Sequence, residues 1–146
     1  MPVRVRPLEA GDHDAWLPLW QGYLEFYKAS IPPDVTVATW RRIVDREGPI
    51  HAFGAFDDAG RMVGIVHYLF HPVTWSEANR CYLEDLFVSP AARGTGAGRA
   101  LIEAVYRAAD DAGADQVYWL TAQDNATARR LYDRVARATP FMKYQR

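Results

Sequence analysis

The sequence has only one cysteine and no long apolar run. That cysteine, Cys81, excludes an intramolecular disulfide and a multi-cysteine zinc site, and it fits a reducing compartment. No window approaches the roughly 20 apolar residues that a membrane-spanning helix needs, and nothing at the N-terminus marks the chain for export. We therefore expect a cytoplasmic protein with no membrane partner.

An excess of either charge is also missing, because 17 lysines and arginines oppose 18 aspartates and glutamates. The net charge of -1 gives no general electrostatic reason to bind nucleic acid. The composition, 49% hydrophobic and 24% charged, is typical of a globular protein. Repeats and linker-like segments are lacking too, so we expect one domain over residues 1–146.

Hydrophobic periodicity predicts an α/β chain with a mixed (α+β) sheet. Strands are expected near residues 3–8, 52–56, 62–70, 82–88, 117–120 and 141–144. Helices are expected near residues 14–27, 35–44, 101–112 and 125–135. This order favours a central mixed, mostly antiparallel sheet with helices on both of its faces.

A glycine-rich segment between the strand at 82–88 and the following helix has the features of an anion site. It reads Arg93-Gly94-Thr95-Gly96-Ala97-Gly98, and Arg99 follows it. Glycines let the backbone come close to a ligand, and the free amides and dipole of a helix N-terminus favour a negative group. Flanking arginines can add charge-assisted contacts. The segment therefore predicts a phosphate-binding turn.

Two nucleotide motifs do not fit this turn. A Walker loop requires Gly-Lys-Ser/Thr, which the sequence lacks, and a dinucleotide fingerprint requires a third glycine where Arg99 stands. Asp115 is spaced like a ribose-binding acid, but it directly follows the helix-ending Gly113. We therefore discount a dinucleotide-binding enzyme.

The turn and a second motif together resemble the GCN5-related N-acetyltransferases, the GNAT family. The family's coenzyme A signature, Gln/Arg-x-x-Gly-x-Gly/Ala, is matched by Arg93, Gly96 and Gly98. A second motif is matched by Asn125-x-x-Ala128-x-x-Leu131-Tyr132. The resemblance implies the GNAT fold, with acetyl-CoA as co-substrate at a splay after the strand that ends at Val88.

The resemblance also implies where acetyl-CoA is held. The backbone of Leu86, Phe87 and Val88 would lie along the pantetheine arm, and the glycine-rich turn would bind the pyrophosphate. Asn125 would orient the pantetheine. Residues 82–88 and 117–119 are most similar to histone and polyamine acetyltransferases, which indicates a primary amine on a small molecule or on a lysine-bearing protein. A homodimer is expected, because dimers are frequent in this family.

Acetylation of such an amine needs a base, because an alkylamine with a pKa of roughly 10.4 is protonated at neutral pH. The resemblance assigns Glu84 as general base and Tyr132 as general acid. Tyr27 and Asp85 are assigned to substrate binding, although a regular strand would turn Asp85 to the face opposite Glu84. These roles have plain structural alternatives: strand carboxylates bound to an arginine or solvent, and tyrosines packed in the core.

Other functions stay open at this point. The chain could be a non-catalytic module that binds acyl-CoA, or its acceptor could be an aminoglycoside or an amino acid. His67 and His71 are spaced like a helical metal pair, but their surroundings are typical of a strand and no glutamate follows His67, so no metal is expected.

Overall fold

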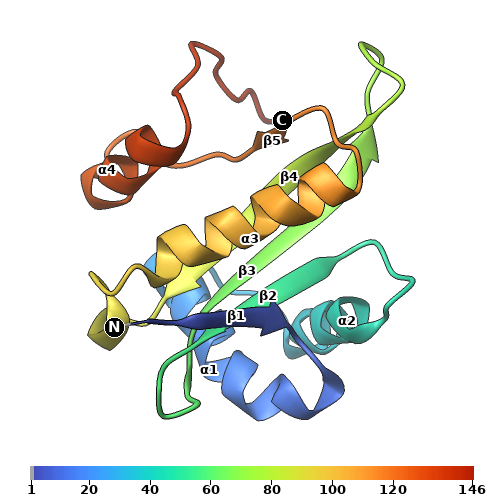
Figure 1. The fold of residues 1–146 in the computed structure, drawn as a ribbon. Coiled ribbons are helices and arrows are strands. Elements are labelled where there is room, and N and C mark those ends of the chain that lie inside the picture. The colour runs from blue at the N-terminus through green and yellow to red at the C-terminus, as the bar shows by residue number, and fades with distance from the viewer. Residues whose placement is uncertain (1) are drawn as a thin grey trace.

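The computed structural model describes residues 2–146, which form one five-stranded sheet flanked by helices (Figure 1). The strands are β1 (Arg4–Pro7), β2 (His51–Phe56), β3 (Met62–Pro72), β4 (Asn79–Val88) and β5 (Val117–Tyr118). The α-helices are α1 (His13–Phe26), α2 (Pro33–Val44), α3 (Ala97–Asp111) and α4 (Ala126–Val135), and short 3₁₀ helices cover Ala10–Asp12 and Pro90–Ala92. None of the helices in this described part is long and apolar enough to cross a membrane.

The strands lie in the sheet in chain order, from β1 to β5. Neighbours are antiparallel from β1 to β4, whereas β4 and β5 are parallel. Parallel neighbours need a crossover, and α3 makes it between these two strands. The predicted mixed, mostly antiparallel sheet is confirmed.

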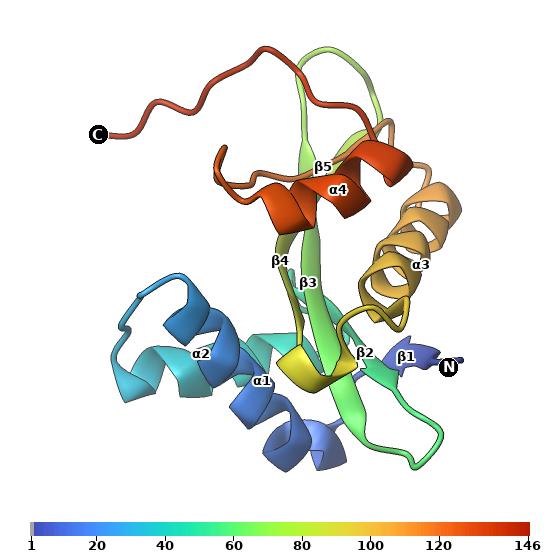
Figure 2. The same cartoon turned by 90° about the vertical axis from the view of Figure 1, so that its left-hand side faces the viewer.

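Helices cover both faces of this sheet, with α3 on one side and α1 and α2 on the other (Figure 2). On the α3 side, Leu101 and Val105 pack in one cluster with Val66 of β3. On the α1 side, Trp16 packs in a second cluster with Ile65. The adjacent β3 residues Ile65 and Val66 thus pack in the clusters on opposite faces of the sheet, because side chains alternate along a strand.

The fifth strand is shorter than the sequence predicts. Only Val117 and Tyr118 pair with β4, opposite Cys81 and Tyr82, and the described chain places no strand beside the rest of that β4 edge. β4 and β5 therefore diverge after two residue pairs. The predicted strand at 141–144 is wrong: residues 136–146 contain no strand, and the edge strand β5 offers only two residues to pair with.

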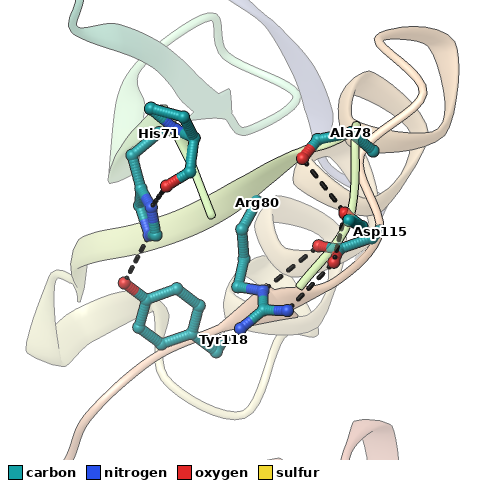
Figure 3. A network of polar contacts seen from close by, with 7 residues as sticks. His71, Ala78, Arg80, Asp115 and Tyr118 are labelled. Atoms are coloured by element: carbon teal, nitrogen blue, oxygen red, sulfur yellow. Dashed lines mark hydrogen bonds and ion pairs between the residues drawn. The ribbon is translucent and has the colours of Figure 1, made fainter. Parts of the chain in front are cut away.

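Side chains of β3 and β4 hold β5 and the residues before it at the closed end of this divergence (Figure 3). The Arg80 guanidinium donates to both carboxylate oxygens of Asp115, at 3.1 and 2.9 Å. The Tyr118 hydroxyl donates to His71 Nε2 at 2.8 Å, because His71 Nδ1 donates to the Pro72 carbonyl. These bonds fix the point from which the two strands separate.

Candidate active site

A β-bulge in β4 brings two acidic side chains to one face of the sheet. Asp85 stands opposite His67 on β3, whereas Leu83 stands opposite Tyr68, so Glu84 is the extra residue. Leu83 packs in the α3-side core, while Glu84 and Asp85 both line a cavity on the other side. The expectation that Asp85 points away from Glu84 is wrong, because it assumed a regular strand.

Two cavities meet at Glu84. The smaller one, about 90 Å³, lies between α1, α2 and β4 and is lined by Trp20, Thr39, Arg42, Ile50, His67, Glu84 and Asp85. The larger one, about 580 Å³, lies where β4 and β5 diverge and is lined by Tyr23, Tyr27, Tyr82, Leu83, Glu84, Leu86, 119–123, Tyr132 and 141–143. Glu84 is the one residue of the described chain that lines both cavities.

Tyr132 reaches the larger cavity from α4, the helix that Asn125 caps by accepting the Ala128 amide at 3.4 Å. The Tyr132 ring packs edge-on against Trp119, with the ring centroids 5.4 Å apart. Burial raises the pKa of Tyr132 to about 12, so its hydroxyl keeps its proton at neutral pH. Tyr132 is thus both a packed aromatic residue and part of the cavity wall.

The junction of the cavities concentrates negative charge. Burial and then the neighbouring Asp85 carboxylate raise the pKa of Glu84 above its usual value. Tyr23 and Tyr27 approach from the end of α1, and burial followed by the charge of Asp85 raises the pKa of each hydroxyl. A cation placed here would relieve the repulsion between the carboxylates and face aromatic rings.

The glycine-rich turn has the backbone shape that an anion site needs. Gly94 and Gly96 adopt left-handed conformations, with φ of +81° and +86°. Gly96 is the N-cap of α3 and supplies no side-chain cap, which leaves the first-turn amides available. Ala97 is buried, and a Cβ on Gly98 would lie 3.2 Å from Leu131 of α4. The turn therefore lies close beneath the helix of the second motif.

Polar residues around this turn differ in their availability. The Thr95 hydroxyl donates to the carbonyl of Ala92, which stabilises the turn from within. Arg99 donates to Glu103 at 2.7 Å along the exposed side of α3. Arg93 is exposed at the end of the 3₁₀ helix. Of the two arginines, Arg93 is therefore the more readily available for a ligand.

The end of β4 divides its side chains between the two faces. Leu86 lines the larger cavity, and Val88 packs against the α3-side core. The Phe87 ring instead points toward α1, where it would lie 2.9 Å from a Cβ on Gly22. Phe87 can therefore contribute to the larger cavity only through its backbone.

Sequence reasoning missed two residues of the smaller cavity, His67 and Arg42. The sequence alone suggests only a metal-ligand role for His67, and residues 2–146 hold no group of three or more histidine, cysteine or acidic side chains placed to bind a metal. A histidine within the apolar run 62–70 is itself a signal, because a buried polar group needs partners. Arg42 lies on an amphipathic helix and gave no such signal.

A family model described as "Acetyltransferase (GNAT) family" matches residues 14–136. The chain belongs to the GNAT acetyltransferase family. It is an acetyl-CoA-dependent N-acetyltransferase, as the two motifs predicted. Over 145 residues the acetyltransferase is 39% identical to the D-amino-acid N-acetyltransferase HPA3 of Saccharomyces cerevisiae, and the match covers 99% of this chain and 90% of that protein.

Solved structures of more distant proteins share the fold of the acetyltransferase. The aminoglycoside acetyltransferase AAC(6')-Iy, in complex with a CoA-containing bisubstrate analogue, gives a TM-score of 0.85 at 20% identity and covers 100% of this chain and 98% of that chain. A ribosomal-protein-alanine N-acetyltransferase from Brucella melitensis biovar Abortus 2308 gives 0.82 at 23% identity, with 99% and 98% covered. The predicted GNAT fold is confirmed.

Proposed function

We propose that the acetyltransferase moves an acetyl group from acetyl-CoA directly to the amine of a small amino acid, with Glu84 as general base and Tyr132 as general acid. The observation that carries this proposal is the position of Glu84 between two cavities, to which we assign one substrate each. Because the amine and the thioester can meet at this residue, the transfer needs no covalent enzyme intermediate.

The larger cavity suits the donor. The unpaired edge of β4 offers backbone amides and carbonyls to the amide groups of the pantetheine arm, and Leu86, Trp119 and Tyr132 offer apolar walls. The first-turn amides of α3, with Arg93 near them, suit the pyrophosphate. Acetyl-CoA bound there supplies an acetyl thioester next to Glu84.

Replacing Gly96 with alanine is expected to weaken acetyl-CoA binding about tenfold. The left-handed backbone at φ +86° costs an L-residue roughly 1–2 kcal/mol, so the variant relaxes and moves the first-turn amides. Isothermal titration calorimetry measures the Kd. Gly60→Ala is the matched control, because Gly60 has φ +79° and equal free space in the β2–β3 turn. Equal Kd values for the two variants would contradict the assignment of the turn.

Glu84 and Tyr132 would manage the protons of the reaction. Glu84 takes a proton from the bound ammonium, so the nitrogen lone pair can form the C–N bond. A backbone amide at the open β4 edge near Val88 stabilises the negative charge on the thioester oxygen. As the C–S bond breaks, Tyr132 donates a proton to the thiolate. The ammonium nitrogen loses two protons in total. One proton is matched by the proton that the thiolate gains to become the thiol, and the other is released to water.

The smaller cavity suits an acceptor that carries both charges. Arg42 of α2 lines the same space as Glu84 and Asp85, and it forms no ion pair within residues 2–146. An amino acid would place its ammonium against the carboxylates and its own carboxylate against the guanidinium. The activity named for the yeast relative supports this acceptor class.

Replacing Arg42 with glutamine is expected to raise the KM for an amino acid by about 10- to 100-fold, which corresponds to the loss of a charged hydrogen bond. The KM for the matching amino-acid amide, which lacks the carboxylate, should stay unchanged. Arg41→Gln is the control, because Arg41 neighbours Arg42 on α2 but does not line the cavity. Equal effects on the acid and its amide would overturn this acceptor assignment.

A polyamine or a protein lysine is the second candidate acceptor. Tyr27 and Tyr82 line the larger cavity beside Glu84, and aromatic faces suit an extended cation that enters from this side. Such an acceptor has no carboxylate next to its amine for Arg42 to bind, so Arg42 does not contribute to its affinity. Rates with spermidine or a lysine peptide that exceed those with amino acids, and that Arg42→Gln leaves intact, would favour this candidate.

A further inference from the structure

His67 is the one polar or charged residue that is buried in the described chain, with 2% of its surface exposed. It lies in β3 directly opposite Asp85, at the bulge that creates the site. The mechanism above gives it no task. Both of its ring nitrogens nevertheless have partners: Trp16 Nε1 lies 3.1 Å from His67 Nε2, and Asp85 Oδ2 lies 2.9 Å from His67 Nδ1.

The chemistry of these partners sets the direction of both bonds. An indole N–H can only donate, so His67 Nε2 accepts from Trp16 and carries no proton. The proton of the neutral ring therefore lies on Nδ1, which donates to the Asp85 carboxylate. Trp16, His67 and Asp85 form one chain of donated hydrogen bonds that leads from the core to the cavity.

Packing holds the first member of this chain in place. Trp16 is completely buried and stacks on Trp20 at 5.9 Å between ring centroids, and the Trp40 ring lies 4.9 Å away. The Trp20 ring also packs against His67, at 5.4 Å. With Trp16 and Trp20 packed against it, and Trp40 packed behind Trp16, the His67 ring has little freedom to flip or to admit water.

We propose that Trp16 and His67 are positioning residues that orient the Asp85 carboxylate and leave its charge uncancelled, so that Asp85 binds the acceptor ammonium while Glu84 acts as base. This inference rests on the proposed acetylation of an amine. A protonated His67 would be a cation 2.9 Å from Asp85 and would compete with the substrate for it. The Trp16 N–H opposes this protonation, because it occupies the Nε2 lone pair that a second proton would need.

Four titratable or charged side chains lie near the His67 ring and influence whether it becomes protonated. Asp85 and Glu84 come from β4 and Arg42 comes from α2; all three line the smaller cavity with it. Tyr23 approaches Asp85 from α1. The two carboxylates favour a second proton on His67, whereas burial and the Arg42 guanidinium oppose it. The donor at Nε2 is the further obstacle that loss of the Trp16 N–H removes.

The tautomer of His67 can be measured without any substrate. Long-range ¹H–¹⁵N spectra of the full chain distinguish the two neutral tautomers and the imidazolium, and His67→Asn identifies the His67 signals among those of the 4 histidines. We expect a neutral ring with the proton on Nδ1, as the bonds from Trp16 and to Asp85 require. A proton on Nε2, in a neutral or a charged ring, would overturn the inference.

Kinetics test the consequence for the substrate. Trp16→Phe should raise the KM for the cationic acceptor on the order of tenfold at pH 6, since His67 can then take a proton and cancel Asp85, while kcat and the KM for acetyl-CoA stay near their original values. Trp40→Phe is the matched control, because the Trp40 ring also packs against Trp16 but lines neither cavity. A KM increase that is equal in both variants would overturn the inference.

A rescue experiment covers the case in which Trp16→Phe fails to fold. His67→Asn keeps an N–H donor near the Nδ1 position and cannot become charged, so its acceptor KM should stay within about threefold of the original, whereas His67→Leu should raise it about tenfold. Equal KM values for the two variants would contradict the inference. If no amine is acetylated by the native chain, the proposed function is wrong, and the NMR result alone then decides the tautomer.

Discussion

Replacing Glu84 with glutamine is expected to lower kcat/KM at pH 7 by about 10²- to 10⁴-fold, the range typical of losing a general base. Glutamine keeps the shape and the hydrogen-bond acceptor of the side chain but cannot take a proton from the ammonium. Steady-state thiol release measures the effect. Glu47→Gln is a suitable control, because this exposed glutamate lines neither cavity.

The pH dependence gives a second view of the same residue. Burial and the Asp85 carboxylate raise the pKa of Glu84, so Glu84 becomes protonated at a higher pH than an ordinary glutamate. As the pH falls through this raised pKa, kcat/KM is expected to fall with the loss of the free carboxylate. The residual activity of Glu84→Gln should lack this acidic limb. The same acidic limb in the variant would assign it to another group.

The stability of Glu84→Gln should change in the opposite direction from its activity. Because the pKa of Glu84 is raised in the folded chain, its stabilising contribution is present below the unfolded pKa and is lost as the pH rises through the folded pKa. At pH 7 the charged Glu84 therefore weakens the fold. We expect a small rise in Tm for the variant at pH 7 and none below pH 4. A lower Tm at pH 7 would indicate a damaged site rather than a missing base.

Replacing Tyr132 with phenylalanine is expected to lower kcat by about 10- to 100-fold, with the KM for acetyl-CoA nearly unchanged. The ring would still pack against Trp119 in the larger cavity, so only the proton donor is lost. With its pKa raised to about 12, the native hydroxyl is protonated at every working pH and can serve as an acid.

The control for this prediction is Tyr106→Phe, which removes another partly buried tyrosine hydroxyl from the same region. Tyr106 of α3 donates to the Val135 carbonyl at the end of α4 and lines neither cavity. Its loss should cost about 1 kcal/mol of unfolding free energy without lowering kcat. If both variants retain full kcat, sulfur is protonated by water and the acid role of Tyr132 is wrong.

The local features of this protein were the ones that its sequence predicted well. Helix and strand order follows from periodicity, and the turn from Arg93 to Gly98 is specified by glycines at the positions that need a left-handed backbone. Asn125 caps α4, and its residue type before a helical stripe is a local signal for such a cap. These features depend on neighbours in the chain, so the chain itself reveals them.

Features that depend on distant contacts were missed. The bulge that turns Asp85 to the side of Glu84 arises from the register between β3 and β4, which alternation in one strand does not reveal. The Trp16–His67 bond joins residues 51 positions apart. Arg42 enters the site only because α2 packs near the sheet. The base and acid were inferred from a resemblance, whereas the smaller cavity, to which we assign the acceptor, could be found only in the folded chain.

The most direct test of the central claim, transfer to an amino-acid amine at Glu84, is thiol release from acetyl-CoA with a panel of acceptors. The panel contains D- and L-amino acids, their amides, spermidine, a lysine peptide and an aminoglycoside, and mass spectrometry identifies each product. We predict the highest kcat/KM with small amino acids, one N-acetyl product per thiol, and loss of both in Glu84→Gln. Release with no amine, or equal release from native chain and Glu84→Gln, would contradict the claim.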